Sequence, residues 1–179
     1  MADRSVRPAA PADAAAVAAV QLLVWRTAYV GIIPAGALAE LTEPAAVHRW
    51  SEDLAAPPSR QHRVLVAVEE DRVVGLAALA PGDAPPMAED PAAGELLLLL
   101  VDPDSRNRGH GSRLLAAAVD HLRTDGFATA YTWVVAADAR SRRFLAAAGW
   151  AVDGAARELD MGQPVREVRL HTDLSLIHI

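Results

Sequence analysis

The segment from Arg106 to Ser112, RNRGHGS, holds the residues of this chain that are best suited to bind an anion. It carries Gly109 and Gly111 beside arginines, and it follows the apolar run ELLLLLV, which ends at Val101. The residues after it show helical periodicity, so the segment lies at the start of a predicted helix. Backbone N–H groups at a helix start lack internal partners and lie at the positive end of the helix dipole. Because glycines let the main chain approach an anion and guanidinium groups fit phosphate oxygens, the pattern predicts a pyrophosphate site.

Two better-known phosphate motifs do not fit this segment. A dinucleotide-binding fingerprint requires a third glycine at position 114, where the chain has Leu114, and it normally opens a domain. A P-loop requires the sequence Gly-Lys-Ser/Thr, and the segment contains no lysine. A tight turn with solvated arginines is the remaining alternative. The apolar strand before the turn and the amphipathic helix after it argue against that alternative.

The elements around the segment predict a mixed α/β fold. Residues 94–103 are apolar at successive positions, which is typical of a central strand covered on both faces. The helix after the turn ends before Gly126, a C-cap, and one face of it carries Leu114, Leu115, Ala118, Val119 and Leu122. Further helices are predicted over 14–29, 35–41, 44–54 and 141–148, and further strands over 63–70, 73–80, 128–135, 150–154 and 165–174. This order indicates one domain, which we expect to cover residues 1–173.

Bulk composition narrows the classes of function. The chain has 179 residues, 52% of them hydrophobic and 22% charged, which predicts a globular protein, and it has no cysteine for disulfides or thiolate chemistry. Its formal net charge of −6 disfavours a nucleic acid partner. The longest aliphatic run, Leu96 to Val101, is too short to cross a bilayer, and no apolar signal segment begins the chain. We therefore expect a cytoplasmic protein without a membrane partner. The scattered histidines show no metal-ligand spacing, so no metal site is expected.

Three segments, taken in order, resemble one family. The segment LLLVDPDSRNRGHGSRLL resembles the acetyl-CoA-binding motif of GCN5-related N-acetyltransferases (GNAT), in which Arg/Gln-x-x-Gly-x-Gly/Ala follows a strand ending in V-x-P. Arg106, Gly109 and Gly111 occupy the motif positions. The downstream TWVVAADARSRRFLAAAGWAVDG resembles the second half of the family, and WRTAYVGIIP is similar to a bacterial branch with WR.AY.GLLP in its first helix region. The resemblance extends over residues 5–173.

The resemblance implies a fold and a cofactor site. The implied fold is that of the acyl-CoA N-acyltransferases, a mixed, centrally splayed β-sheet flanked by helices. Backbone groups at the end of the fourth strand would bind the pantetheine arm of acetyl-CoA, and amides of the turn would hold its pyrophosphate. The implied cofactor-binding residues are Leu99, Leu100, Val101, Arg106, Asn107, Arg108, Gly109, His110, Gly111, Ser112, Asp138 and Ser141.

Two positions depart from the family pattern. Asp138 stands where many members have an Asn that contacts the cofactor, and an ionised Asp cannot donate a hydrogen bond. A helix N-cap is the favoured role for Asp138. Leu145 follows Phe144, where many members have a Tyr that returns a proton to the thiolate. Tyr29 or a water molecule is an alternative source of that proton.

The resemblance also implies the reaction, which is direct attack by a primary amine on the acetyl thioester. Glu95 is the candidate general base, acting through water, and the alternatives are a solvated carboxylate or one that binds a cationic acceptor. Trp25 and Tyr29 lie in the helix that would border the pocket for the acceptor, a small-molecule or peptide amine; a core position is the favoured alternative for Trp25, and both roles stay open for Tyr29. A catalytically weak acyl-CoA-binding or sensor protein is the alternative function. Members of the family are often dimers, so a homodimer is an open expectation.

The last six residues, LSLIHI at 174–179, form an unusual ending. They match the in-frame translation of a transposase adapter used in sequencing libraries. We therefore expect residues 174–179 to be a non-native tail, although a short apolar tail is the alternative.

Overall fold

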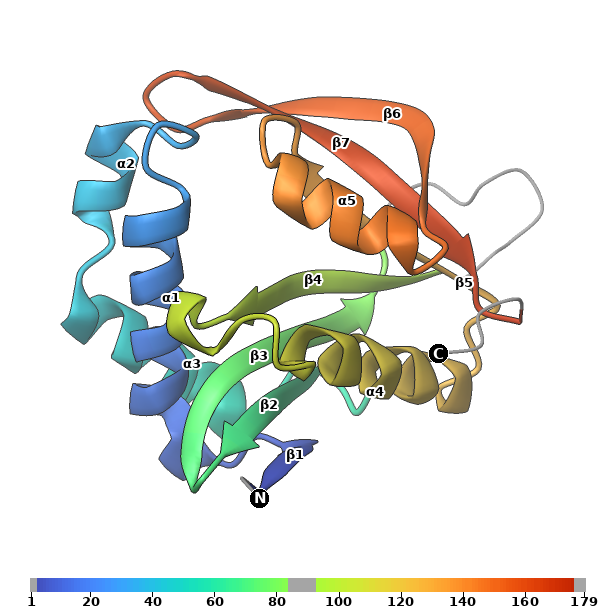
Figure 1. The fold of residues 1–179 in the computed structure, drawn as a ribbon, viewed down its shortest axis with the longest axis horizontal. Coiled ribbons are helices and arrows are strands. Elements are labelled where there is room, and N and C mark those ends of the chain that lie inside the picture. The colour runs from blue at the N-terminus through green and yellow to red at the C-terminus, as the bar shows by residue number, and fades with distance from the viewer. Residues whose placement is uncertain (1–2, 84–92, 176–179) are drawn as a thin grey trace.

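A mixed β-sheet of seven strands forms the framework of the part of the chain that our computed structural model describes, residues 3–83 and 93–175 (Figure 1). The strands lie in the order β1-β2-β3-β4-β5-β7-β6, and β4 with β5 is the parallel pair. This arrangement confirms the predicted α/β class and the central position of the apolar strand. The strands are β1 (Arg4–Pro8), β2 (Arg63–Glu69), β3 (Arg72–Pro81), β4 (Ala93–Val101), β5 (Thr129–Val135), β6 (Ala151–Asp160) and β7 (Pro164–Asp173).

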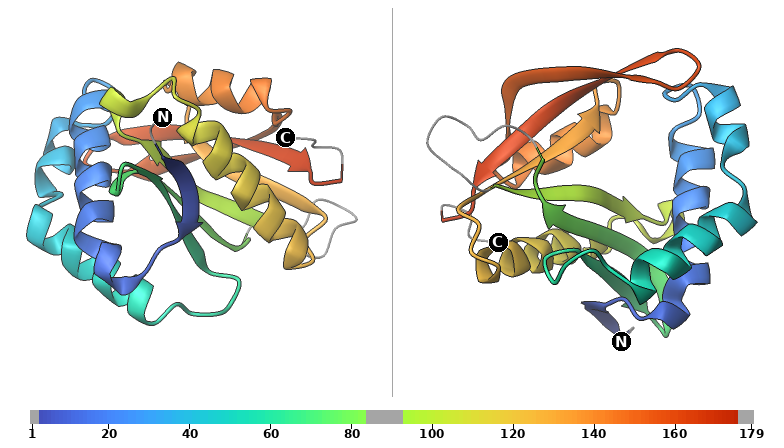
Figure 2. Two further views of the ribbon diagram at one scale, coloured as in Figure 1. Left: turned by 60° about the horizontal axis from the view of Figure 1, so that its bottom comes forward. Right: turned by 180° about the vertical axis from the view of Figure 1, so that it is seen from behind.

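Helices cover both faces of this sheet (Figures 1 and 2). On one face, α1 (Ala14–Ala28) and α3 (Glu43–Ala55) pack on β2, β3 and β4, and the short α2 (Ala35–Glu40) lies beside α1. On the other face, α4 (His110–Thr124) packs on β2, β3 and β4, and α5 (Ala139–Ala147) lies under β5 and β7. The chain order of a central strand, a helix and a parallel strand therefore places the start of α4 at the carboxyl end of β4.

The core of the protein follows from the apolar faces of β4 and α4. All five apolar residues predicted for one face of α4 are buried, with at most 1% of their surface exposed. Leu96 and Leu99 of β4 pack toward α4, whereas Leu98 and Leu100 pack toward α1. This alternation is broken at Leu97, where a β-bulge shifts the register against β3 and leaves the side chain 46% exposed.

The N-terminal segment differs from its prediction. Strand β1 was not predicted, because RSVRP has no alternating apolar pattern and takes its order from pairing with β2. Asp13 precedes α1 as expected but makes no cap bond to it. Its carboxylate accepts hydrogen bonds from Arg7 and from the backbone of Ala10 instead.

The expected non-native tail begins at a residue that the structure places in the core. Leu174 is 1% exposed, and its N–H donates to the carbonyl oxygen of Ala128. Its own carbonyl oxygen accepts a 2.6 Å hydrogen bond from Nε of Arg123, in the last turn of α4. Residues 176–179 lie outside the described part of the chain.

Candidate active site

The sheet splits between β4 and β5. The two strands pair over three residues only, the last pair being Glu95 with Tyr131, and β5 and β7 then diverge from β4 toward α1 (Figures 1 and 2). At the point of divergence, Oγ1 of Thr132 donates a 2.7 Å hydrogen bond to the carbonyl oxygen of Leu96. The Thr132 side chain thus joins the two strands at the point where their main-chain pairing ends, and we call this point the vertex of the split.

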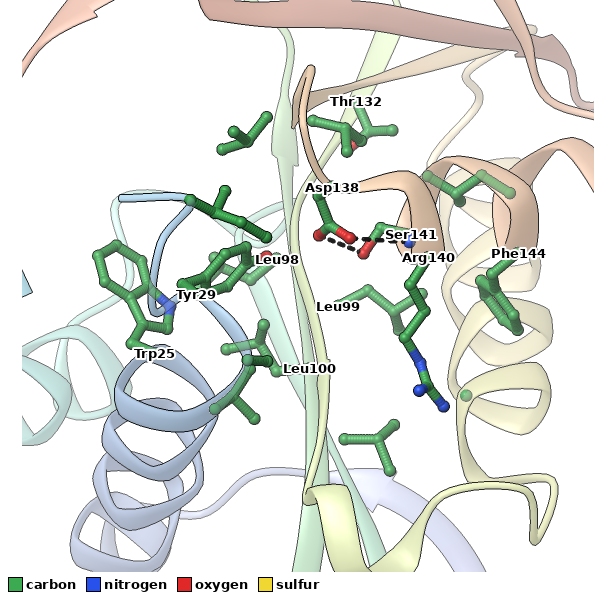
Figure 3. Close-up of a pocket in the computed structure, with 18 of the residues that line it drawn as sticks. Trp25, Tyr29, Leu98, Leu99, Leu100, Thr132, Asp138, Arg140, Ser141 and Phe144 are labelled. Carbon is green, nitrogen blue, oxygen red and sulfur yellow. Dashed lines mark hydrogen bonds between the residues drawn. The ribbon is translucent and has the colours of Figure 1, made fainter. Parts of the chain in front are cut away.

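A cavity of about 640 Å³ occupies the split. Its floor is β4 from Leu96 to Val101, and the ends of α1 and α5 face each other across that floor (Figure 3). The turn before α4 borders the cavity at its other end. The cavity brings together nearly all of the expected cofactor and acceptor residues, namely Trp25, Tyr29, Leu99, Leu100, Val101, Arg106, Asn107, Gly109, His110, Gly111, Ser112, Asp138 and Ser141.

The turn before α4 exposes backbone donors to this cavity. Asn107 and Gly109 have left-handed φ angles of 60° and 84°, and Gly109 is the N-cap of α4 without a side chain to bind the first N–H groups. A Cβ at Gly111 would lie 3.4 Å from the ring of Phe144, in ordinary van der Waals contact, so the start of α4 packs closely against α5 at this glycine. The start of a 15-residue helix, unblocked by side chains, is therefore available to an anion.

Two guanidinium groups reinforce the positive end of α4. Arg106 and Arg140 both line the cavity. Burial and the neighbouring charge of Arg140 lower the pKa of Arg106, and the group still remains a cation. From the sequence, a solvated helix face is the favoured role for Arg140, Arg142 and Arg143, and contact with the adenosine 3′-phosphate of the donor is the alternative; the structure places Arg140 in the cavity lining. Its position at the start of α5 is the signal that could have identified it.

Arg108 lies differently from the expected cofactor contact. Its guanidinium is behind the turn, where Nη1 donates to Oε2 of Glu69 at 3.1 Å, and its side chain is absent from the described cavity lining. The guanidinium of Arg108 therefore bonds to Glu69 at the end of β2, and the part of Arg108 that borders the anion site is its backbone.

Asp138 caps α5, as the sequence favoured. Its carboxylate accepts hydrogen bonds from the backbone N–H of Ser141 at 3.0 Å and from Oγ of Ser141 at 2.7 Å (Figure 3). The residue is 8% exposed and lines the cavity. Asp138 thus presents a negative charge to the split, opposite the side chain of Tyr29.

The predicted acceptor residues lie at the end of α1. The rings of Trp25 and Tyr29 are 6.0 Å apart in an edge-to-face arrangement, and both line the cavity (Figure 3). Burial, followed by the negative charge of Asp138, raises the pKa of Tyr29. The phenol is therefore held in its protonated form, as a hydrogen-bond donor inside the split.

Glu95 lies just beyond the cavity, in the part of β4 that is still paired with β5. Its Oε2 accepts a 3.0 Å hydrogen bond from the hydroxyl of Tyr131. Burial raises the pKa of Glu95, and the hydrogen bond from Tyr131 opposes that shift. The structure therefore gives Glu95 a half-buried carboxylate near the vertex, one residue from the cavity floor.

Several residues on β5 and β7 were missed by the sequence analysis. Thr132, Trp133 and Glu167 line the cavity beyond the vertex. Arg157 stacks over the ring of Trp133 at 4.3 Å and donates to Glu167 at 2.6 Å. Alternation along 128–135 could have indicated two faces for this strand, but the partner register of β7 is needed to show which face borders the split.

Comparisons with known proteins agree with this geometry. The family model of the acetyltransferase (GNAT) family matches residues 29–150, and the chain belongs to this family. Mycothiol acetyltransferase of Rhodococcus jostii is 34% identical over 110 residues, which are 60% of this chain and 31% of that protein. The matched region thus spans about a third of that relative. The uncharacterized N-acetyltransferase YuaI of Bacillus subtilis is 27% identical over 133 residues, covering 73% of this chain and 71% of that protein.

A solved structure shows the same fold. The PaiA N-acetyltransferase of Thermoplasma acidophilum, solved in complex with coenzyme A, superposes with a TM-score of 0.73 at 15% identity. The alignment covers 96% of this chain and 99% of that one. The fold expected from the resemblance is therefore confirmed. Among the described residues, no helix is long and apolar enough to span a membrane.

Proposed function

We propose that this protein transfers the acetyl group of acetyl-CoA to a primary amine, by direct attack of the amine on the thioester. The observation that carries the proposal is the split between β4 and β5, which leads from a glycine turn at the start of α4 to a closed vertex. A long, narrow donor with an anion at one end and a reactive group at the other fits such a split.

The residues of the turn fit the diphosphate of acetyl-CoA. The N-terminal amides of α4 would bind its oxygens, and Arg106 and Arg140 would neutralise its charge. Backbone groups of Leu99 to Val101 lie along the split, where they would bind the amides of the pantetheine arm. When bound, acetyl-CoA supplies an acetyl thioester, whose carbonyl a backbone N–H of β4 would polarise.

The amine would approach from the side of α1. Trp25 and Tyr29 border that side, and the indole N–H of Trp25 is buried without a hydrogen-bond partner among the described residues. Trp133 and Glu167 face them from β5 and β7. We infer a small-molecule or peptide amine as the acceptor class, recognised by these aromatic and polar groups.

Glu95 is the proposed general base, acting through water. Its half-buried position and its raised pKa suit a carboxylate that accepts a proton, and the cavity begins at its neighbour, Leu96. A relay is needed because Glu95 itself does not line the cavity.

The departing thiolate has no Tyr at position 145 to protonate it, since Leu145 is apolar and buried. A thiol pKa of about 8.5 makes the thiolate a tolerable leaving group near neutral pH. Tyr29 lines the cavity, and its raised pKa keeps the phenol protonated, so it can donate a hydrogen bond to the thiolate although the same shift disfavours transfer of the proton itself. The apolar residue at 145 also favours the second candidate function, a weakly active acyl-CoA-binding or sensor protein.

Titration calorimetry with acetyl-CoA, combined with a thiol-release assay over a panel of amines, tests the proposal. Binding together with amine-dependent thiol release supports the acetyltransferase. Binding without transfer to any amine supports the sensor instead, and a folded protein that binds no acetyl-CoA contradicts both. Gly111→Phe adds a ring where a Cβ already lies 3.4 Å from Phe144, and loss of acetyl-CoA binding in this variant supports the site when its circular dichroism matches that of the wild type.

A further inference from the structure

A cluster of charged and polar side chains with a buried centre lies behind the glycine turn, and of its four members His110 alone also borders the cavity. Its centre is Glu69, the last residue of β2. Oε1 of Glu69 accepts a 2.8 Å hydrogen bond from Nε of Arg4. Oε2 lies 3.1 Å from Nη1 of Arg108 and 3.3 Å from Nε2 of His110. One carboxylate therefore joins strand β1 to two residues of the turn, which are distant in sequence.

The cluster keeps Glu69 ionised. The side chain of Glu69 is 7% exposed and that of His110 is 1% exposed. Hydrogen bonds from Arg4, then from His110 and Arg108, lower the pKa of Glu69 to about 2. A buried carboxylate is stable only when such partners replace its hydration, so the carboxylate and its cations depend on one another.

The turn needs outside support, because its backbone is irregular. Asn107 and Gly109, on either side of Arg108, both have left-handed φ angles. The carbonyl oxygen of Arg108 accepts hydrogen bonds from Nη1 of Arg113 at 3.2 Å and from Nη1 of Arg4 at 3.5 Å. The side chains of Arg108 and His110, which flank Gly109, meet at the same oxygen of Glu69.

We propose that Glu69 is a positioning residue for donor binding, acting through Arg108 and His110 to aim the amides of the turn at the diphosphate of the donor. The inference rests on the proposed function, which places acetyl-CoA at this turn. Glu69 lies behind the turn and would not touch the donor. We expect Glu69 to strengthen the binding of donors that carry the nucleotide diphosphate, and to have no effect on donors that lack it.

The test compares two donors in the wild type and in Glu69→Gln. Gln keeps the size of the side chain and removes the negative charge that faces the guanidinium of Arg108 and the imidazole of His110. We expect the dissociation constant and the KM for acetyl-CoA to rise about tenfold, which is the usual size of the effect when a residue that orients a ligand-binding group is removed. The kcat/KM for S-acetylpantetheine, which has no diphosphate, is expected to stay within twofold of the wild-type value. A merely structural role of Glu69 would lower activity with both donors alike.

Asp125→Asn is the matched control. Asp125 lies at the other end of α4, and its carboxylate accepts hydrogen bonds of 3.0 and 2.6 Å from Arg63, at the start of β2. This variant breaks a comparable ion pair between the same strand and helix. It should leave the ratio of kcat/KM for acetyl-CoA to kcat/KM for S-acetylpantetheine unchanged. If Glu69→Gln fails to fold, Arg108→Gln removes one of the two connections from the turn side and is expected to show the same donor selectivity.

Three outcomes separate the inference from the proposed function. A wild type that binds acetyl-CoA, with variants that bind it equally well, overturns the inference alone. Equal losses with both donors overturn it as well. A folded wild type that binds no acetyl-CoA overturns the proposed function, and the inference with it.

Discussion

The two ends of α4 are held by the same strand in opposite ways. At its N-terminal end, β2 supplies the carboxylate of Glu69, and the helix side supplies the guanidinium of Arg108 and the imidazole of His110. At its C-terminal end, β2 supplies the cation Arg63 and the helix side supplies the carboxylate of Asp125. Both ion-pair clusters anchor the helix to the sheet, so anchoring alone does not distinguish the ends.

The difference lies in the backbone. At the C-terminal end, the N–H groups of Gly126 and Phe127 donate back to Arg123 and Leu122, so the last carbonyl groups of the helix are satisfied. At the N-terminal end, the cap residue Gly109 offers no side chain to the first N–H groups. One end closes on itself, whereas the other leaves its first N–H groups without a side-chain acceptor from the cap residue. A binding site can thus be recognised by what the fold leaves unsatisfied.

The largest expected loss of stability is at the closed end. Leu174 packs there and its carbonyl accepts from Arg123. Leu174→Ala should lower the free energy of unfolding by about 3 kcal/mol, because it removes a buried side chain and leaves a cavity. Denaturant unfolding measures this loss, and acetyl-CoA affinity should not change. A loss below about 1 kcal/mol would show that Leu174 is not part of the core.

We propose that residues 174–179 are non-native, and we then expect the natural residue at 174 to be apolar.

A matched pair of glycines tests the open end directly. Gly109 and Gly126 have φ angles of 84° and 90°, so Ala at either position costs about 1–2 kcal/mol in backbone strain. Gly109→Ala should also weaken acetyl-CoA binding about 100-fold, because it moves the amides of the turn. Gly126→Ala should leave binding unchanged, since a Cβ there meets no atom within 4 Å. Calorimetry on both variants measures the contrast, and equal effects on binding would break the comparison.

Acid should weaken the open end through Glu69. The folded-state pKa of Glu69, about 2, lies below the unfolded value of about 4.3. The stability from its ion pairs is therefore present in full above about pH 4.3 and is lost as the pH falls toward 2. Melting temperatures of the wild type and of Glu69→Gln should differ most near pH 6, differ less near pH 3, and converge only near pH 2. A difference that is constant over this range would contradict the role of its charge.

The smallest effect is expected at the ion pair of the closed end. Arg63 is about one-third exposed, so solvent screens its attraction to Asp125. Asp125→Asn should cost at most about 1 kcal/mol of unfolding free energy at low salt, and less in 1 M NaCl. Unfolding curves at the two salt concentrations check this prediction. A loss that grows with salt would show that the pair acts by something other than charge.

The sequence predicts the parts of this fold that depend on local pattern. The buried face of α4, the C-cap Gly126 and the N-cap Asp138 follow from periodicity and short-range hydrogen bonding, and the structure confirms them. The glycine turn was predicted in the same way, because its residues are contiguous.

Long-range pairing explains what the sequence could not show. Glu69 and His110 are 41 positions apart, and only the packing of β2 beside the start of α4 brings them together. Strand β1 likewise has no apolar pattern of its own. His110 was expected to matter for its main chain, and the structure adds an imidazole that contacts a distant carboxylate. Neither the register of β7 nor the hydrogen bond from Thr132 to Leu96 has a local signal.

The hydrogen bond from Thr132 to Leu96 turns the split into a slot of fixed depth. From Leu96 to Val101 the floor extends over six residues, or roughly 16 Å for the five steps between them at the usual rise of a strand. An arm that enters from the turn reaches the Thr132 hydroxyl after that length, and a longer acyl chain would have to break the bond that closes the sheet. We infer that the vertex limits how far the acyl end of the donor can extend, so donor choice would depend on length as well as on charge.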